Sequence, residues 1–394
     1  MACVRKIREG KYRIDYRDDR GNRYRKFFTT RKAADDDLST HRQELNTGTF
    51  VRPKDVPTFA EVARDWLETK RAGNYRPSTL QSWRTHLDNH LLHEEHGIGH
   101  LRLNKIDVPR VERFTQERRT AGVSPQTCNK ILTTATAIFR FAVRHKKTVT
   151  NPAADAERLK VGALELRDRE DAERTGVEVQ EDEVLSPDEL GRLLQNADEG
   201  FYRTLFQTTA LTGARHDELL ALMWSDFDFD AGKVTIRRSL SWAKVDKDDA
   251  TQPRFFPPKT KAGRRTIDLP PELLHVLKVW KLQCPPGELD LVFPTPEGKP
   301  AHRSNVLRWG LYPALERAGL RRVHMHSLRH SFASSLIMAG EPPTRVANLL
   351  GHSSPAVTMR VYAHWFKDVK TEAVNNLAKQ LFSPPQKPKQ AKSA

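Results

Sequence analysis

The sequence predicts an α+β, multidomain protein, with a mostly helical last domain that contains a small β-sheet, preceded by a helical domain and a small N-terminal β-sheet module. Three observations support this prediction. A chain of 394 residues has room for about two or three domains. Runs of alternating character occur near the N-terminus, and helix-start signals recur through the middle of the chain. An acidic segment then separates the middle from a second, larger domain.

Residues 1–52 are predicted to form the N-terminal module. The runs Lys11–Arg17 and Arg23–Phe28 alternate in polarity and are joined by polar turn residues, which predicts a β-hairpin. The segment Arg31–Asn46 is expected to pack across this sheet as a helix. The exposed arginines and lysines of the sheet either grip DNA phosphates or form an ordinary solvated face.

Residues 57–155 are predicted to form the helical domain, with four helices of which the last spans about Pro125 to Lys147. The helix-start signals are Thr58 with Glu61, Ser78 with Gln81, Asp107 with Pro109, and Ser124 with Pro125.

The rest of the chain is divided by the acidic segment, residues 160–183, which we interpret as a linker. The larger domain is predicted to span 184–382, because Ser186, Pro187 and Glu189 combine an N-cap, a proline at the first helical position and a capping box. The tail 383–394 is rich in proline and lysine, and we expect it to be disordered.

Charge and cysteine content restrict the class of partner and the compartment. Lys plus Arg number 66 against 50 Asp plus Glu, a net charge of +16, which favours a polyanion such as nucleic acid. The cysteines are far apart and form no CxxC pair, which argues against a disulfide framework. No apolar run approaches the roughly 20 residues of a membrane span. We expect a soluble, cytoplasmic protein.

Two segments in the last domain carry basic residues beside glycine turns. Leu211–Leu219 predicts a helix end, a turn at Gly213 and a new helix beginning at Arg215. Pro258–Leu269 contains lysines and predicts a β-hairpin tip that enters a strand, with the turn at Gly263. Taken singly, the first has an ordinary explanation as a surface ion pair and the second as solvated charge.

Two later segments add histidines, an arginine and a tyrosine. His326 and Arg329 are three residues apart at a helix start, so both face the same way and are able to meet one phosphate. The segment Leu349–His364 contains His352 and Tyr362, the last tyrosine of the chain. A cation at a helix start opposes the helix dipole, which hints at a bound anion. A lone tyrosine beside apolar residues is usually packing.

In this order, the four segments resemble the active-site motifs of the tyrosine recombinase (phage integrase) family. The resemblance implies a set of catalytic residues, which are Arg215, Lys259, His326, Arg329, His352 and Tyr362. It also makes Glu218 a residue that orients Arg215. Lys261 stays open as the alternative lysine, because a long charged insertion, Ser241–Phe256, precedes this segment.

These residue types suit metal-free breakage of a phosphodiester. Guanidinium groups bind the non-bridging oxygens in pairs and replace a metal ion, while His352 adds a hydrogen bond. Tyr362 attacks phosphorus, His326 is the candidate proton acceptor, and Lys259 protonates the leaving 5′ oxygen. The 3′-phosphotyrosine link is reversed by a 5′ hydroxyl of another strand. The scheme implies no cofactor, neither ATP nor a metal.

The resemblance implies a site-specific recombinase that integrates or excises a phage or other mobile element. Residues 57–155 would then bind core-site DNA, and residues 1–52 arm-site DNA. The implied partners are double-stranded DNA attachment sites, a homotetramer on paired sites, and DNA-bending or excision proteins, with no membrane. The alternatives are a type IB-like topoisomerase and a non-catalytic DNA-binding regulator with an integrase-like fold.

One cluster lies outside these motifs. It consists of His86, His90, His93, His96 and His100. Histidines four residues apart share a helix face, so a zinc site is one hypothesis. An ordinary polar helix surface is the stronger one, and contacts to DNA phosphates are a third. An HExxH motif from His93 would need a histidine at Gly97, so the sequence predicts no metal site.

Overall fold

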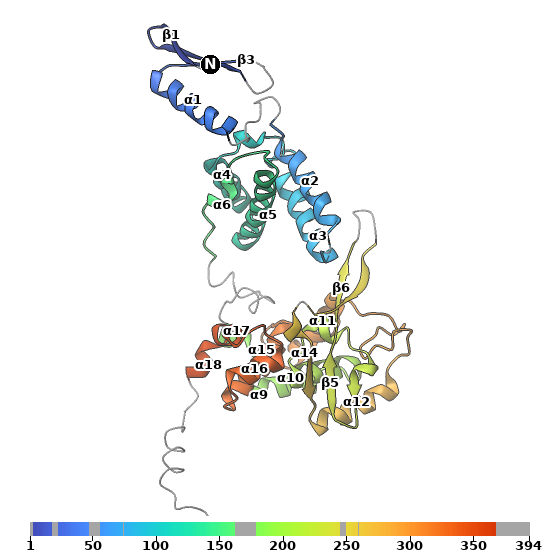
Figure 1. Ribbon diagram of the computed structural model, residues 1–394. Coiled ribbons are helices and arrows are strands. Elements are labelled where there is room, and N and C mark those ends of the chain that lie inside the picture. The colour runs from blue at the N-terminus through green and yellow to red at the C-terminus, as the bar shows by residue number, and fades with distance from the viewer. Residues whose placement is uncertain are drawn as a thin grey trace, which may run out of the picture. The chain divides into compact units, whose positions relative to one another are not determined.

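The computed structural model of this protein describes residues 3–17, 23–46, 56–73, 75–161, 179–244, 250–258 and 260–367. The chain forms two compact units, one built chiefly from Met1–Glu165 and the other from the residues that follow (Figure 1). Of the predicted linker 160–183, residues 162–178 lie outside the described residues. The predicted tail 383–394 lies entirely outside them. Within the described part of the chain, no helix is both long and apolar enough to cross a membrane.

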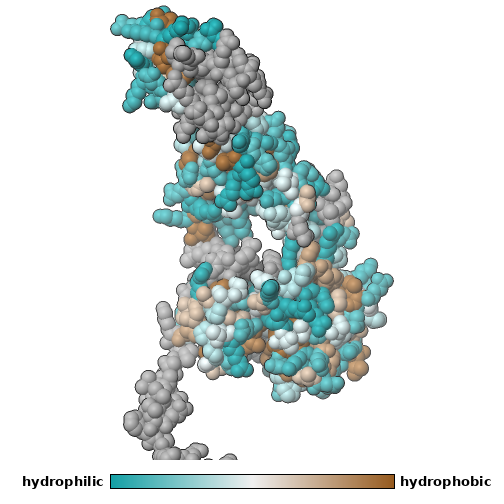
Figure 2. Space-filling model, viewed as in Figure 1, coloured by the Kyte–Doolittle hydropathy of each residue, from teal (hydrophilic) through white to brown (hydrophobic). Residues whose placement is uncertain are grey.

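The N-terminal module is a three-stranded antiparallel sheet with one helix against it. Its elements, in the sheet order β1-β2-β3, are β1 (Cys3–Arg8), β2 (Lys11–Arg17), β3 (Arg23–Phe28) and the helix α1 (Arg31–Asn46). Ile14 is fully buried against Ala34 and Leu38 of α1. The predicted hairpin and helix are confirmed. The strand β1 was not predicted, because apolar and polar residues do not alternate regularly along it. The face of the module seen in Figure 2 is mostly hydrophilic.

In the helical domain, most of the main helices begin where the sequence predicts their N-caps. Its elements are α2 (Phe59–Arg71), α3 (Pro77–His86) continued by the π-helix η1 (Leu87–Leu91), the 3₁₀ turn η2 (Leu103–Lys105), α4 (Val108–Thr120), α5 (Pro125–Arg144) and the short α6 (Pro152–Asp155). Thr58, Asp107 and Ser124 cap α2, α4 and α5 as expected. The prediction at Ser78 is wrong: Arg76 is the N-cap, because Pro77 occupies the first helical position.

The second unit is mostly helical. Among its described residues, the α-helices are α9 (Pro187–Asn196), α10 (Phe201–Thr212), α11 (His216–Leu219), α12 (Pro271–Gln283), α13 (Arg303–Val306), α14 (Tyr312–Arg317), α15 (Met325–Met338), α16 (Pro343–Leu350), α17 (Pro355–Val361) and α18 (Ala363–Lys367). The π-helix η6 (Leu307–Leu311) precedes α14, and 3₁₀ turns lie at η3 (Glu181–Glu183), η4 (Trp224–Asp226) and η5 (Lys261–Gly263). The predicted capping box of Ser186 and Glu189 starts α9.

Two small antiparallel sheets complete this unit. One has the order β4 (Phe227–Asp228), β5 (Lys233–Ile236), β8 (Arg265–Asp268), and the other pairs β6 (Ser239–Ala243) with β7 (Gln252–Phe256). The packing of α10 on α15, of α15 on α16, and of α16 on β8 brings the four motif segments onto one framework. Large buried side chains such as Phe206, Phe293 and Leu328 form the core beneath it.

Candidate active site

Arg215 lies at the junction of two helices. α10 ends at Thr212 and is capped by Gly213, which has a left-handed φ of 60°. A Cβ atom on Gly213 would approach the ring of Phe332 to 2.4 Å, so a side chain there would displace the ring. α11 then begins with Arg215 as its N-cap residue. The helix end, glycine turn and restart are therefore as the sequence predicts.

Glu218 is a buried carboxylate that holds two arginines. The backbone N–H of Arg215 donates to Oε2 of Glu218 and its Nη1 donates to Oε1, both at 3.0 Å. Arg265 donates from Nη2 to Oε2 at 2.9 Å. Burial raises the pKa of Glu218, but the charges of Arg265 and Arg215 outweigh it and lower the pKa from 4.5 to about 2. The carboxylate therefore stays ionised at neutral pH, and Glu218 contacts Arg215 as expected.

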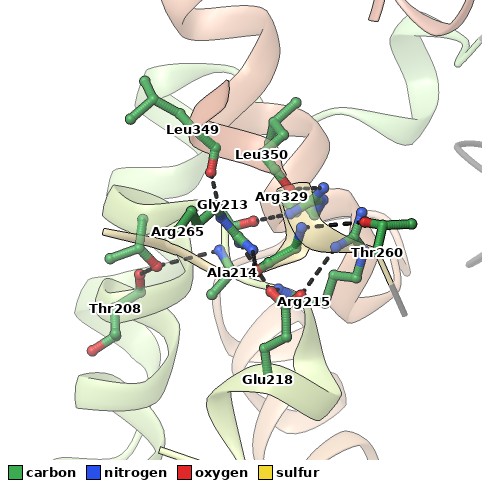
Figure 3. Close-up of polar contacts among 12 residues, drawn as sticks. Thr208, Gly213, Ala214, Arg215, Glu218, Thr260, Arg265, Arg329, Leu349 and Leu350 are labelled. Atoms are coloured by element: carbon green, nitrogen blue, oxygen red, sulfur yellow. Dashed lines mark hydrogen bonds and ion pairs between the residues drawn. The ribbon is translucent and has the colours of Figure 1, made fainter. Parts of the chain in front are cut away.

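Arg265 belongs to this network although sequence reasoning missed it (Figure 3). Besides Glu218, its Nε donates to the carbonyl of Leu349 at 2.6 Å and its Nη1 to that of Gly263 at 3.2 Å. Its side chain points inward from β8, where buried and exposed residues alternate. An arginine at an inward position of an alternating strand is the signal that identifies it.

Arg329 is fully buried and joins three of the motif segments. One Nη donates to the carbonyl of Gly213, and Nη2 donates to the carbonyl of Leu350 at 2.7 Å. Arg329 itself lies in the first half of α15. A buried guanidinium with its donors aimed at backbone carbonyls has a well-defined orientation.

His352 follows α16, which is capped by Gly351 in a left-handed conformation with φ 68°. Its Nδ1 lies 2.8 Å from Oγ1 of Thr358, and both side chains are buried. A hydroxyl beside one ring nitrogen fixes the orientation of the imidazole. Sequence reasoning found His352 but gave Thr358 no role.

Tyr362 is fully buried at the end of α17. Its hydroxyl lies 2.6 Å from Nδ1 of His330, which is also buried. His326 lies one helical turn before His330, with the two ring centroids 5.8 Å apart. From the sequence, His326 is the candidate proton acceptor and His330 has no role, although His330 directly follows Arg329 in the same segment.

Comparisons with known proteins show the family of this chain. The model of the phage integrase family matches residues 183–368, and the model of the phage integrase central domain matches residues 59–158. The chain belongs to the tyrosine recombinase family of phage integrases. It is therefore a recombinase that transfers DNA strands, as the four motif segments predict.

Relatives of this recombinase match along most of its length. A XerC-like tyrosine recombinase of Caldanaerobacter subterraneus is 25% identical over 394 residues, covering 94% of this chain and 97% of the relative. The prophage integrase IntR of Escherichia coli is 25% identical over 366 residues, covering 84% and 82%. The match to both family models and to full-length recombinases agrees with the predicted α+β, multidomain fold.

Solved structures show the same fold. A Tn1549 transposon integrase in complex with circular-intermediate DNA matches with a TM-score of 0.62 and 16% identity, covering 82% of this chain and 99% of that chain. A lambda integrase tetramer bound to a Holliday junction matches with a TM-score of 0.55 and 17% identity, covering 89% and 96%.

The lysine segment of the recombinase differs from the predicted hairpin. β8 pairs with β5, whereas β7 pairs with β6, so Pro258–Leu269 connects two sheets through the 3₁₀ turn η5. The charged insertion Ser241–Phe256 is instead where the hairpin lies, since it contains most of β6 and all of β7. Lys259 lies outside the described residues, and Lys261 is exposed on η5.

The histidine cluster of the helical bundle has a geometry that does not suit an ion. Ligand atoms of His93, Glu95 and His96 lie within 4.8 Å of one another. The two imidazoles stack with centroids 3.7 Å apart and planes 15° from parallel. Imidazole lone pairs lie in the ring plane, so two stacked rings do not direct them at one point without rotating. His93 and His96 are therefore not oriented as ligands of one ion.

Proposed function

We propose that this recombinase integrates or excises a mobile element by stepwise strand exchange at paired attachment sites, with Tyr362 as the nucleophile. One observation carries the proposal: Arg329 bonds the carbonyls of Gly213 and Leu350. Each of these carbonyls lies two residues before another predicted catalytic residue, Arg215 or His352. A single guanidinium thus fixes both neighbouring groups, as a site that binds one phosphate requires.

The proposed reaction needs no group beyond those that the motifs supply. Arg215, Arg329 and His352 bind the non-bridging oxygens of the scissile phosphate. The Tyr362 oxygen bonds to phosphorus as the bond to the 5′ oxygen breaks. His326 accepts the tyrosine proton, and Lys259 protonates the 5′ oxygen. Attack of a 5′ hydroxyl from a second strand then releases the tyrosine.

DNA, further copies of the chain and accessory proteins are the proposed partners. The helical domain, residues 57–155, binds core-site DNA, and the module of residues 1–52 binds arm-site DNA. Four protomers act on two paired duplexes. The similar lambda integrase structure is likewise a tetramer, bound to a Holliday junction. DNA-bending or excision proteins are the proposed accessory partners.

A two-site strand-exchange assay tests this function. The protein is incubated with two duplexes of different length that carry candidate attachment sites, one of them end-labelled. Recombinant duplexes are the expected product. Nicking and rejoining of each duplex without exchange would support the topoisomerase alternative. Binding of verified sites without any cleavage would support the non-catalytic regulator.

Thr358 gives a prediction that tests the proposed role of His352. If the threonine hydroxyl donates to Nδ1, the proton of the neutral ring lies on Nε2, ready to be donated to a phosphate oxygen. Thr358→Val keeps the shape and removes the donor, so the rate of DNA cleavage should fall on the order of 10-fold. Thr358→Ser should restore it. In a His352→Ala background the valine should have no further effect, and an additive loss would contradict the role.

The N-terminal sheet gives a second prediction. Arg5 and Arg25 are exposed, and a hydrogen bond from Arg23 lowers the pKa of Asp15 to about 2, so one charged carboxylate partly offsets the cations. Replacing both exposed arginines with alanine should weaken arm-site binding. It should also reduce the slope of log affinity against log salt by about 2, one phosphate contact for each arginine.

Lys32 on α1, also exposed, is the control for this experiment. Lys32→Ala should leave the salt slope nearly unchanged if the sheet, and not the helix, contacts DNA. Filter binding between 50 and 200 mM salt, a range over which counterion release is readily seen, measures the slopes. Equal slopes for the double variant and the wild type would contradict the arm-binding role.

A further inference from the structure

The predicted nucleophile is withdrawn from the protein surface. Tyr362 has an exposed fraction of 0% and belongs to an apolar cluster with Ile337, Val346 and Trp365. Its hydroxyl is satisfied inside the protein at 2.6 Å from His330 Nδ1. In this structure the tyrosine is therefore in a retracted position, and its oxygen has to leave His330 before it attacks a phosphate.

The same cluster is closed by the chain that enters the unit, residues Val179–Leu185, which we name the strap. Val179 is buried against the tyrosine cluster, and its backbone N–H donates to the carbonyl of Val361 at 2.9 Å. This carbonyl belongs to the residue immediately before the nucleophile. The strap thus contacts the backbone that has to move if Tyr362 is to extend.

Side chains of the unit fasten the strap at its other end. Arg321 donates to the carbonyl of Asp182 at 2.7 Å and also to that of Val184. The N–H of Leu185 donates to Oγ of Ser331 at 2.9 Å, directly after His330 in α15. The strap and the tyrosine contact therefore share one helix. The last residues of the predicted acidic linker pack on this unit and do not hang free of it.

We propose that His330 is a positioning residue that holds Tyr362 in its retracted position, and that the strap Val179–Leu185 stabilises this position through Val361. This inference rests on the proposed function, in which Tyr362 is the nucleophile. Extension moves the hydroxyl away from His330 toward the end of α15 that carries His326, one helical turn away. A hydrogen bond of ordinary net strength biases such a two-position equilibrium on the order of 10-fold.

Two substitutions of His330 distinguish a residue that holds Tyr362 retracted from one that promotes catalysis or stabilises the fold. The amide of asparagine places a polar atom near the position of imidazole Nδ1, whereas leucine has no polar atom there. The readout is the initial rate at which protein becomes joined to the 3′ phosphate of a nicked duplex with a single site and no partner site. His330→Leu should react on the order of 10-fold faster than the wild type, and His330→Asn should resemble the wild type.

Slower reaction of His330→Leu would overturn the proposal, because it would show that His330 promotes catalysis or stabilises the fold. Equal rates for all three proteins would overturn it as well. Thermal unfolding of each variant identifies one that does not fold. Val179→Pro then serves as the second variant, because proline lacks the N–H that holds Val361. It should also react faster than the wild type.

Nitration of Tyr362 by tetranitromethane, quantified by mass spectrometry without DNA, gives a readout that does not depend on catalysis. Leucine at position 330 should increase nitration of Tyr362, and asparagine should not. If the wild type forms no adduct on a verified site, the proposed function fails while nitration still tests the retracted position. Equal nitration in every protein would overturn the proposal even if catalysis is observed.

Discussion

Replacing Arg329 with lysine is expected to slow DNA cleavage by about 10²-fold to 10³-fold, the effect of removing a positioned donor from a charge-stabilising site. Arg329 holds the carbonyls of Gly213 and Leu350 and, in the proposed reaction, also binds the scissile phosphate. A lysine ammonium has neither the planar fork nor the reach to make these contacts together. The measurement is the initial rate of covalent adduct formation on nicked DNA.

Arg254→Lys is the matched control, because Arg254 is exposed on β7. Its adduct rate should stay close to that of the wild type. DNA affinity should change little in either variant, because one phosphate contact contributes little to a large basic interface. An Arg329→Lys protein that is folded and cleaves at the wild-type rate would contradict the role given to this guanidinium.

Replacing Glu218 with glutamine is expected to lower the free energy of unfolding by about 3–5 kcal/mol. The carboxylate holds Arg215 and the buried Arg265, and a neutral amide leaves both guanidinium charges uncompensated. Urea unfolding at pH 7 measures the loss. Glu272→Gln on the exposed face of α12 is the control and should change stability little. A loss for Glu218→Gln as small as that of the control would contradict the account.

The pH dependence of stability tests the same carboxylate. The pKa of Glu218 is lowered from 4.5 to about 2 in the folded protein, so its contribution is complete above 4.5 and is lost as pH falls toward 2. The loss corresponds to about 3 kcal/mol. The curve of unfolding free energy against pH should therefore be flatter for Glu218→Gln in this window. Parallel curves would show that the carboxylate is not stabilised by its arginines.

Local features of the sequence predicted much of this fold. The helix starts at Thr58, Asp107, Ser124 and Ser186 depend on side chains within three residues of the cap, so the sequence contains all the information. The restart at Arg215 was equally predictable, because helices commonly end at a glycine that adopts the left-handed conformation. These local signals also position the first of the proposed catalytic residues.

Contacts between distant segments were not predictable in the same way. β8 pairs with β5 and not with β7, and nothing within Pro258–Leu269 specifies its partner strand. Arg265 and Thr358 act through groups that the fold brings to them, the carbonyl of Leu349 in one case and the ring of His352 in the other. His330 follows the predicted catalytic residue Arg329 in the sequence, but only the folded structure shows that it contacts the hydroxyl of Tyr362.

The central claim, that Tyr362 is the nucleophile of a strand-transferring site, is tested most directly by its covalent product. Wild-type protein and Tyr362→Phe are incubated without metal on a nicked duplex that carries an attachment site, and the adduct is digested and mapped by mass spectrometry. We expect a 3′-phosphate linked to Tyr362 in the wild type and no adduct in the variant. Equal amounts of adduct from both proteins would remove Tyr362 as the nucleophile.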